Sequence, residues 1–236
     1  MNPEQVLAAL AEMYASCVTY RDRGKVTTTW FRKGEPNRTT AKPFETAFIR
    51  PDRFRFEFRD RFVEEDPWHR YLVWANGKDV RTWWELEPAA EVRESLSLAL
   101  AGATGISGGA AHTIPNLMMP EEIGGRTLTD LVEVTSLPDA DIGDVSCYRI
   151  QGRPRAIPDD DEFRRVREEF FRTTGVQLPP PVSQYEPITI WIDRGALLVR
   201  RIEDYHVGTA SEQITDYEPE SGTMIPEEEL RFAPLV

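Results

Sequence analysis

Alternating phenylalanine and charged residues between positions 53 and 59 constrain the fold more than any other feature. The sequence there reads Arg-Phe-Arg-Phe-Glu-Phe-Arg, with Phe54, Phe56 and Phe58 at every second position. Successive side chains of a β-strand point to opposite faces, so this spacing predicts a strand with one apolar and one solvated face. Such a face must be covered, either by other parts of the protein or by a ligand.

Turn signals on both sides of this strand predict neighbouring antiparallel strands. Pro51-Asp52 separates it from an expected strand at 39–49, and proline followed by aspartate is typical of a hairpin turn. Asn76-Gly77 lies between two apolar runs and is the strongest hairpin signal in the chain. We therefore expect the first half to be an antiparallel meander. An amphipathic helix at 3–16 and a strand at 20–31, bent near Arg21–Gly24, would precede it.

The residue pattern in the middle of the chain predicts a helix, followed by a movable segment that covers the sheet. Val92, Leu96, Leu100 and Ala103 are spaced by four, four and three residues, which indicates a helix over 91–103. A glycine-rich stretch follows, and then come Met118 and Met119. The whole segment between Ser95 and Pro120 carries little charge. Glycines leave the backbone loosely restrained and methionines are flexible, so this segment suits a lid that packs on the sheet and moves.

The second half returns to the strand pattern. We expect strands at 128–134, 145–150, 188–193, 197–207 and 213–217, followed by a short helical turn over 225–232. An acidic amphipathic helix at 159–174 and the run Pro179–Pro181 interrupt the strands, so residues 153–184 are predicted to form an insertion. With no repeat and no linker in the sequence, residues 1–236 are expected to form one domain.

Composition excludes several classes of protein. The net charge of −12 argues against a nucleic-acid partner, because phosphate binding needs a basic surface. No run reaches the roughly 18–20 apolar residues of a transmembrane segment, and the start of the sequence does not resemble an export signal. We expect either a cytoplasmic protein or one whose leader has been removed. Cys17 and Cys147 either form one bridge or are two separate buried thiols.

Sequence motifs for catalysis, metals and cofactors are weak. His69, His112 and His206 would have to be gathered by folding to form a metal or acid–base site, and none lies in a known metal-binding motif. No serine lies in a nucleophile elbow, and no glycine run has the pattern of a phosphate loop. Acidic clusters at 159–162 and 227–229 lie at expected helix starts, where they favour the helix dipole. We therefore predict no catalytic residue, no metal and no cofactor.

Aromatic and branched side chains are the remaining signal. Seven are predicted to share the inner face of the sheet: Phe54, Phe56, Phe58, Trp74, Trp84, Ile190 and Ile192. One interpretation is a plain hydrophobic core beneath the helix at 91–103. The other is that the few helices leave an apolar cavity, fit for an acyl chain, with Met118 and Met119 at its lid.

The order of several short motifs resembles the LolA-like superfamily of periplasmic lipoprotein carriers, lipid-binding lipoproteins and envelope stress regulators. The motifs are Tyr20-x-x-x-Gly24, Phe48-Ile-Arg-Pro51, Phe54-Arg-Phe56, Trp74-x-Asn-Gly77, Trp83-Trp84, Ile190-Trp-Ile-Asp193, Leu198-x-Arg-Arg and Ile225-Pro-x-x-x-Leu-x-Phe232. The resemblance covers most of the chain. The insertion at 153–184 departs from the compact carrier pattern.

The resemblance implies an α+β, mainly β fold: a half-open antiparallel β-barrel whose helices cover a concave apolar face. It implies that Leu96, Leu100, Met118 and Met119 line the lid side of a cavity, opposite the sheet residues given above. It also implies a lid-gating arginine, which the motifs do not assign. The implied function is non-enzymatic binding of a lipid or lipoprotein acyl chain in the periplasm or cell envelope. The alternatives are an envelope sensor or scaffold that binds a protein partner, and a histidine-dependent hydrolase.

Overall fold

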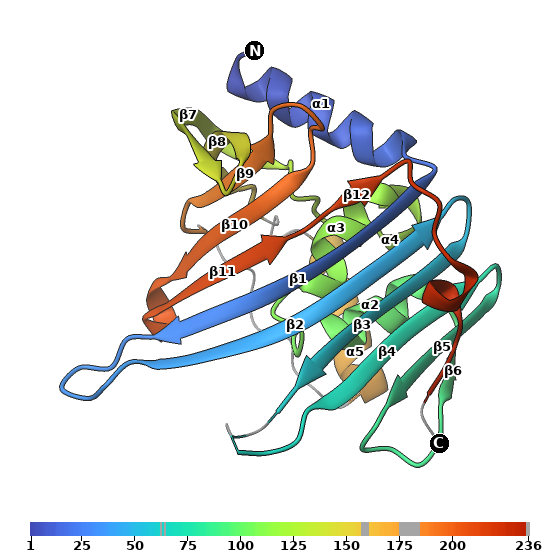
Figure 1. Ribbon diagram of the computed structural model, residues 1–236. Helices are drawn as coiled ribbons and strands as arrows, with labels where there is room; N and C mark the ends of the chain where they lie inside the picture. Colours follow the sequence, from blue (N-terminus) through green and yellow to red (C-terminus); the bar gives the residue numbers. More distant parts are fainter. Residues whose placement is uncertain (62, 64, 157–160, 175–184, 235–236) are drawn as a thin grey trace.

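The computed structural model describes residues 1–61, 63, 65–156, 161–174 and 185–234. They form one antiparallel sheet of 12 strands that curves around a group of helices without closing (Figure 1). The strands are β1 (Thr19–Trp30), β2 (Arg38–Ile49), β3 (Arg53–Asp60), β4 (His69–Asn76), β5 (Asp79–Trp84), β6 (Glu91–Arg93), β7 (Leu131–Ile142), β8 (Val145–Pro154), β9 (Ile188–Asp193), β10 (Val199–His206), β11 (Ser211–Tyr217) and β12 (Glu220–Ser221). The predicted α+β, mainly β class and half-open barrel are confirmed.

Two meanders, joined in the middle, make the sheet. Strands β1–β6 are neighbours in chain order, as are β7–β11, and β1 pairs with β11 from Gly24↔Tyr217 to Trp30↔Ser211. The order across the sheet therefore runs from β6 at one edge to β7 at the other. The chain between β6 and β7 has to travel from edge to edge, so its helices lie across one face of the sheet.

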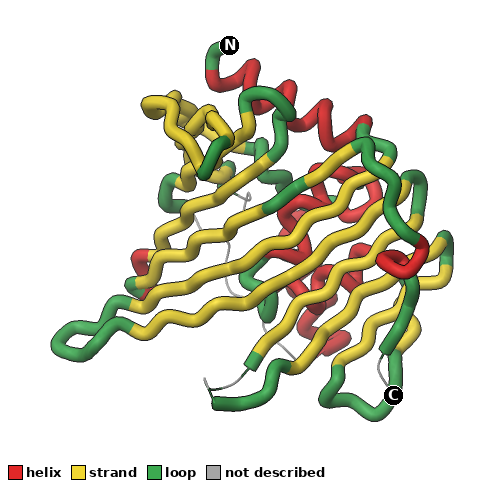
Figure 2. The backbone as a smooth tube through the Cα atoms, viewed as in Figure 1, coloured by secondary structure: helices red, strands yellow, loops and turns green. Residues whose placement is uncertain are grey.

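These three helices cover the concave face, and the N-terminal helix covers its end (Figure 2). They are α2 (Leu96–Thr104), α3 (Ala110–Met118), α4 (Pro120–Ile123) and the N-terminal α1 (Pro3–Ser16). We call α2, α3 and α4 the lid. Helix α1 begins at a capping box, in which the Asn2 side chain accepts from the Gln5 backbone and the Gln5 side chain accepts from the Asn2 backbone, so both exposed amide groups are satisfied.

The remaining helical segments are α5 (Asp161–Thr174), η1 (Val207–Thr209) and η2 (Glu227–Leu230). Helix α5 confirms the helix predicted for the insertion, whereas Pro179–Pro181 lie outside the described residues. The hairpin turns predicted at Pro51-Asp52 and Asn76-Gly77 join β2 to β3 and β4 to β5. Gly77 has a φ of 60°, the left-handed conformation that such a tight turn requires.

The alternation in β3 has the predicted consequence. Phe54, Phe56 and Phe58 are buried in the core, and each pairs with inward-facing residues on both neighbouring strands. Phe56, for example, lies between Thr46 of β2 and Val73 of β4. The Phe56 and Phe58 rings lie with their centroids 6.1 Å apart, and they continue to Phe44 of β2 and Tyr71 of β4, so the inner surface of the sheet is aromatic along β3.

The structure corrects two local predictions. The helix expected over 91–103 begins only at Leu96, because the Ser95 hydroxyl accepts from the Leu98 amide and caps it there. Residues 91–93 instead form edge strand β6, which leaves Val92 77% exposed.

The bend expected near Gly24 is absent, since β1 is continuous through it. Gly24 makes room for its neighbours: a Cβ there would lie 2.2 Å from the Phe44 ring and 2.6 Å from the Asp216 carbonyl oxygen.

Candidate functional site

Sheet and lid residues predicted to face each other belong to one buried cluster. Its members from the predicted set are Phe54, Phe56, Phe58, Leu96, Leu100, Met118, Met119, Ile190 and Ile192. Trp84 packs against the cluster from β5 and is partly buried, with its ring 6.4 Å from that of Tyr71. The inner face and the lid therefore meet as the sequence predicts. A ligand-binding role for these residues stays a prediction.

Trp74 does not share this face, so that part of the prediction is wrong. Its indole nitrogen donates to the Leu230 carbonyl at 2.7 Å, and its ring lies 5.6 Å from that of Phe232. Both partners belong to the C-terminal segment, which packs on the convex side of the sheet. The neighbours of Trp74 in β4, Val73 and Ala75, are in the core cluster, and the residue between them must point the opposite way.

The three histidines are not brought to one place. His69 lies in β4 and His206 in β10, and strands β3, β2, β1 and β11 separate them in the sheet. Five strand spacings correspond to about 24 Å measured along the sheet. His112 lies in the lid helix α3, where Nε2 is 3.2 Å from the Asn116 amide nitrogen. Within the described residues no three histidine, cysteine or acidic side chains are grouped to hold a metal.

The two cysteines are separate buried thiols. Cys17 follows α1, and its Sγ–H donates to the Tyr14 carbonyl at 3.1 Å. Cys147 lies in β8 at the other side of the sheet. Of the two alternatives left by the sequence, the structure thus selects the one without a bridge.

Arg50 is the main polar link between the sheet and the helices. It lies at the β2–β3 turn, and its guanidinium donates to the carbonyl oxygens of Cys17 at 3.0 Å, Met118 at 2.9 Å and Tyr14 at 3.5 Å. One side chain thus holds the C-terminal ends of both α1 and α3. A cation at helix C-termini is favourable because the last carbonyls lack partners within the helix.

The opposite end of the lid is held by two further side chains. Lys42 of β2 donates to the Ile106 carbonyl at 2.8 Å, and Gln213 of β11 donates to the Gly108 carbonyl at 2.9 Å. Both carbonyls belong to the turn between α2 and α3. Gly108 and Gly109 have φ values of 65° and 88°, which side chains with a Cβ rarely adopt. These hydrogen bonds attach the ends of the lid to the sheet, in addition to the apolar packing of its helices in the core.

A carboxyl group lies inside the apolar core. Asp22 of β1 is only 4% exposed, and its Oδ2 accepts from the Tyr20 hydroxyl at 2.7 Å. Its Oδ1 has no hydrogen-bond partner among the described residues. Burial raises the pKa of Asp22 to about 6, against the lowering effect of its hydrogen bonds with Tyr20 and Thr46. Burying a charge in this way is costly.

One pocket opens between the lid and the β7–β11 half of the sheet. It has a volume of about 200 Å³ and lies beside Gly108 and Gly109 at the start of α3. Its apolar lining includes Leu128, Leu131, Ile188 and Ile202, and its polar lining includes His112, Arg126, Asp204, Gln213 and Thr215. Burial lowers the pKa of His112 and raises the pKa of Asp204, so burial disfavours the charged form of both groups.

Comparisons with known proteins find solved structures that are similar to this chain. No protein-family model and no curated protein sequence matches the chain. Among solved structures, LprF from Mycobacterium bovis has a TM-score of 0.51 at 10% identity, covering 96% of this chain and 97% of that one. The lipoprotein LppX from Mycobacterium tuberculosis has a TM-score of 0.46 at 11% identity, covering 94% and 97%. A LolA superfamily protein from Nitrosomonas europaea has a TM-score of 0.33 at 9% identity, covering 98% of each chain.

The fold is LolA-like. This confirms the fold implied by the motif resemblance. Arg50 joins the lid to the sheet through its hydrogen bond to the Met118 carbonyl. Sequence analysis did not single it out. In the described part of the chain, no helix is both long and apolar enough for a membrane span.

Proposed function

We propose that this protein binds the acyl part of a lipid or lipoprotein between its sheet and its lid, and does so in the cell envelope without catalysing a reaction. The observation that carries the proposal is the pocket beside α3, because three of its lining residues, Leu131, Ile188 and Ile202, also belong to the buried cluster. An apolar chain that enters there meets the aliphatic side chains of the buried cluster directly. Burial would contribute about 0.8 kcal/mol for each methylene group removed from water.

The size of the pocket requires the lid to move. At about 200 Å³ it is smaller than the roughly 300–1,000 Å³ of typical ligand sites. An acyl chain would therefore have to separate the lid from the sheet. Four of the buried side chains in the lid are small: Ala99, Ala103, Ala110 and Ala111. They lie beside larger ones such as Leu96, Leu100 and Met118, so separating the lid from the sheet exposes apolar area that the bound acyl chain would have to cover.

Binding of the fluorescent fatty acid cis-parinaric acid tests the proposal. We expect the purified protein to bind it, and native mass spectrometry with lipid extraction to find an amphiphile carried through purification. Thr215→Phe places a ring in the pocket, because Thr215 is buried on β11 and lines it. Excluding about two methylene groups would weaken binding by about tenfold or more.

The matched control is Thr39→Phe, which adds the same ring to an exposed threonine of β2. It is expected to keep the affinity of the wild type within about twofold, since it leaves the pocket unchanged. Absence of parinaric acid binding and of any extracted lipid would contradict the proposal. So would equal losses in the Thr215 and Thr39 variants, which would show that binding occurs away from the pocket.

A further inference from the structure

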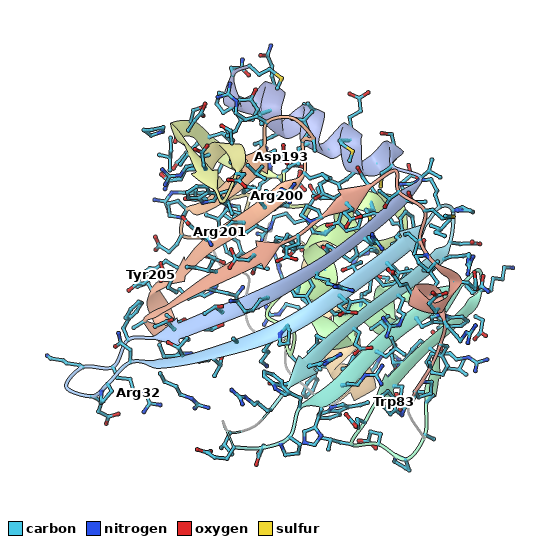
Figure 3. All side chains as sticks on the ribbon, viewed as in Figure 1. Arg32, Trp83, Asp193, Arg200, Arg201 and Tyr205 are labelled. Atoms are coloured by element: carbon cyan, nitrogen blue, oxygen red, sulfur yellow. The ribbon has the colours of Figure 1, made fainter. Side chains whose placement is uncertain are left out.

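The β1–β2 hairpin projects beyond its neighbouring strands at one end of the sheet (Figure 1). Residues 31–39 are exposed without interruption. The turn after β10 lies beside the base of the hairpin, where the Phe31 amide donates to the Ala210 carbonyl at 2.8 Å. We call residues 30–38 and 205–210 together the lip. Figure 3 shows Arg32 and Tyr205 from its two segments at this same end of the sheet.

The lip exposes large apolar side chains in a fixed arrangement. Phe31 is 41% exposed, Tyr205 45% and Val207 61%, and the rings of Phe31 and Tyr205 lie 6.4 Å apart. They come from different segments, so the exposed aromatic pair is built by the tertiary structure. A grouped set of exposed apolar side chains is typical of a surface that contacts a partner or a membrane.

The charge of the lip is opposite to that of the whole chain. Residues 30–38 contain Arg32, Lys33 and Arg38 against the single acid Glu35, a formal net charge of +2, whereas the chain carries −12. Arg38 lies over the Trp30 ring at 5.7 Å, and Arg32 pairs with Glu35 at 3.1 Å. The 205–210 segment contains no Asp, Glu, Lys or Arg. A projecting basic tip in an acidic protein is complementary to an anionic surface.

We propose that the lip docks onto the surface of an anionic lipid bilayer. Phe31, Tyr205 and Val207 would enter the interfacial region, where aromatic side chains are favoured, and the basic side chains would contact anionic headgroups. The remainder of the molecule, being acidic, would be repelled from the same surface, which orients the protein with the lip toward the bilayer.

The lip lies close to the pocket, so docking would bring the bilayer near the ligand site. This part of the proposal rests on the function proposed above. Gln213, which lines the pocket, pairs with Thr28, and Trp30 pairs with Ser211. The two pairs are two residues apart, which is about 7 Å along the strands. A bilayer contacted by the lip would therefore lie near the pocket opening, so a lipid would travel a short distance between them.

Vesicle co-sedimentation in about 0.1 M salt, where surface charges still interact over about 10 Å, tests the docking. The vesicles are phosphatidylcholine alone or phosphatidylcholine with about one-third phosphatidylglycerol. We expect the wild type to bind the anionic vesicles and to bind neutral ones much more weakly. The double variant Arg32→Glu with Lys33→Glu should lose about tenfold or more in affinity, since each basic residue near such a surface contributes about fivefold. Phe31→Ser with Tyr205→Ser should also lose affinity.

The control double variant, Arg23→Glu with Lys78→Glu, has the same net charge as the charge-reversed lip. Arg23 is exposed on the convex face, and Lys78 is exposed at the turn between β4 and β5. It is expected to bind anionic vesicles within about threefold of the wild type, because neither residue is in the lip. Equal losses in both double variants, or no preference of the wild type for anionic vesicles, would overturn the docking proposal. Parinaric acid binding, measured without vesicles, reports on the pocket separately and should stay unchanged in the lip variants.

Discussion

Replacing Asp22 with asparagine is expected to stabilise the protein by about 3 kcal/mol at pH 7.5 and to have almost no effect near pH 4. The pKa of Asp22 is about 6 in the folded protein, raised from 3.8 mainly by burial. A difference of about two pH units corresponds to about 3 kcal/mol. Asparagine has nearly the same shape and still offers an oxygen to the Tyr20 hydroxyl, but it carries no charge.

The sign follows from the direction of the shift. Because the folded state binds the proton of Asp22 more tightly than the unfolded state does, ionisation of this group destabilises the fold. The penalty is absent below about pH 4, grows as the pH rises to about 6, and is constant above that. The groups that face Asp22 are Tyr14 of α1, Tyr20 of β1, Thr46 of β2 and Tyr217 of β11. Exposed Glu45 adds a repulsive charge.

Urea unfolding of the wild type and the variant at several pH values between 4 and 7.5 measures the difference. Asp216→Asn is the control, since Asp216 lies on β11 in a partly exposed ion pair with Arg201 at 2.6 Å. Such a pair contributes about 1 kcal/mol or less. A stability difference between Asp22→Asn and the wild type that is independent of pH would contradict the expectation, as would a loss of stability at pH 7.5.

Replacing Arg50 with methionine is expected to release the lid and to cost about 2–3 kcal/mol of stability. Methionine keeps an apolar stem, but the carbonyl oxygens of Cys17 and Met118 lose their charged donor. Both carbonyls lie at helix ends, where no helical amide can replace it. Amide hydrogen exchange should therefore become faster in residues 96–118 and at the end of α1, with little change in β3 and β4.

Arg53→Met is the matched control for the lid. Arg53 starts β3, three residues after Arg50, but its guanidinium pairs with Glu227 of the C-terminal segment at 2.6 Å. Its replacement should leave exchange in the lid unchanged and cost less than about 1 kcal/mol, as is usual for an exposed ion pair. If exchange in residues 96–118 were the same in both variants, Arg50 would not be the residue that holds the lid.

Local sequence patterns predicted the elements whose signals are short in range. The hairpin turns at Pro51-Asp52 and Asn76-Gly77, the helix at 3–16 and the alternation of Phe54, Phe56 and Phe58 all depend on residues that are close in the chain. In β3 the charged residues between the phenylalanines determine which side chains point inward. In Tyr71–Ala75 every residue is apolar, so the pattern does not distinguish the inner face of the strand from the outer face. The prediction therefore put Trp74 on the wrong face.

The sequence by itself determined that this chain forms a curved antiparallel sheet with an aromatic face and a helical cover. Only the tertiary structure decided how that cover is held. The pairing of β4 with β3 turned Trp74 outward. Folding also brought Arg50 to backbone carbonyl groups at the ends of α1 and α3, and a motif of side chains does not reveal backbone acceptors. It also buried Asp22 among Tyr14, Tyr20 and Tyr217 and joined Phe31 to Tyr205 in the lip. These contacts join residues far apart in the chain, and their free energies depend on burial and geometry, which a local pattern does not contain.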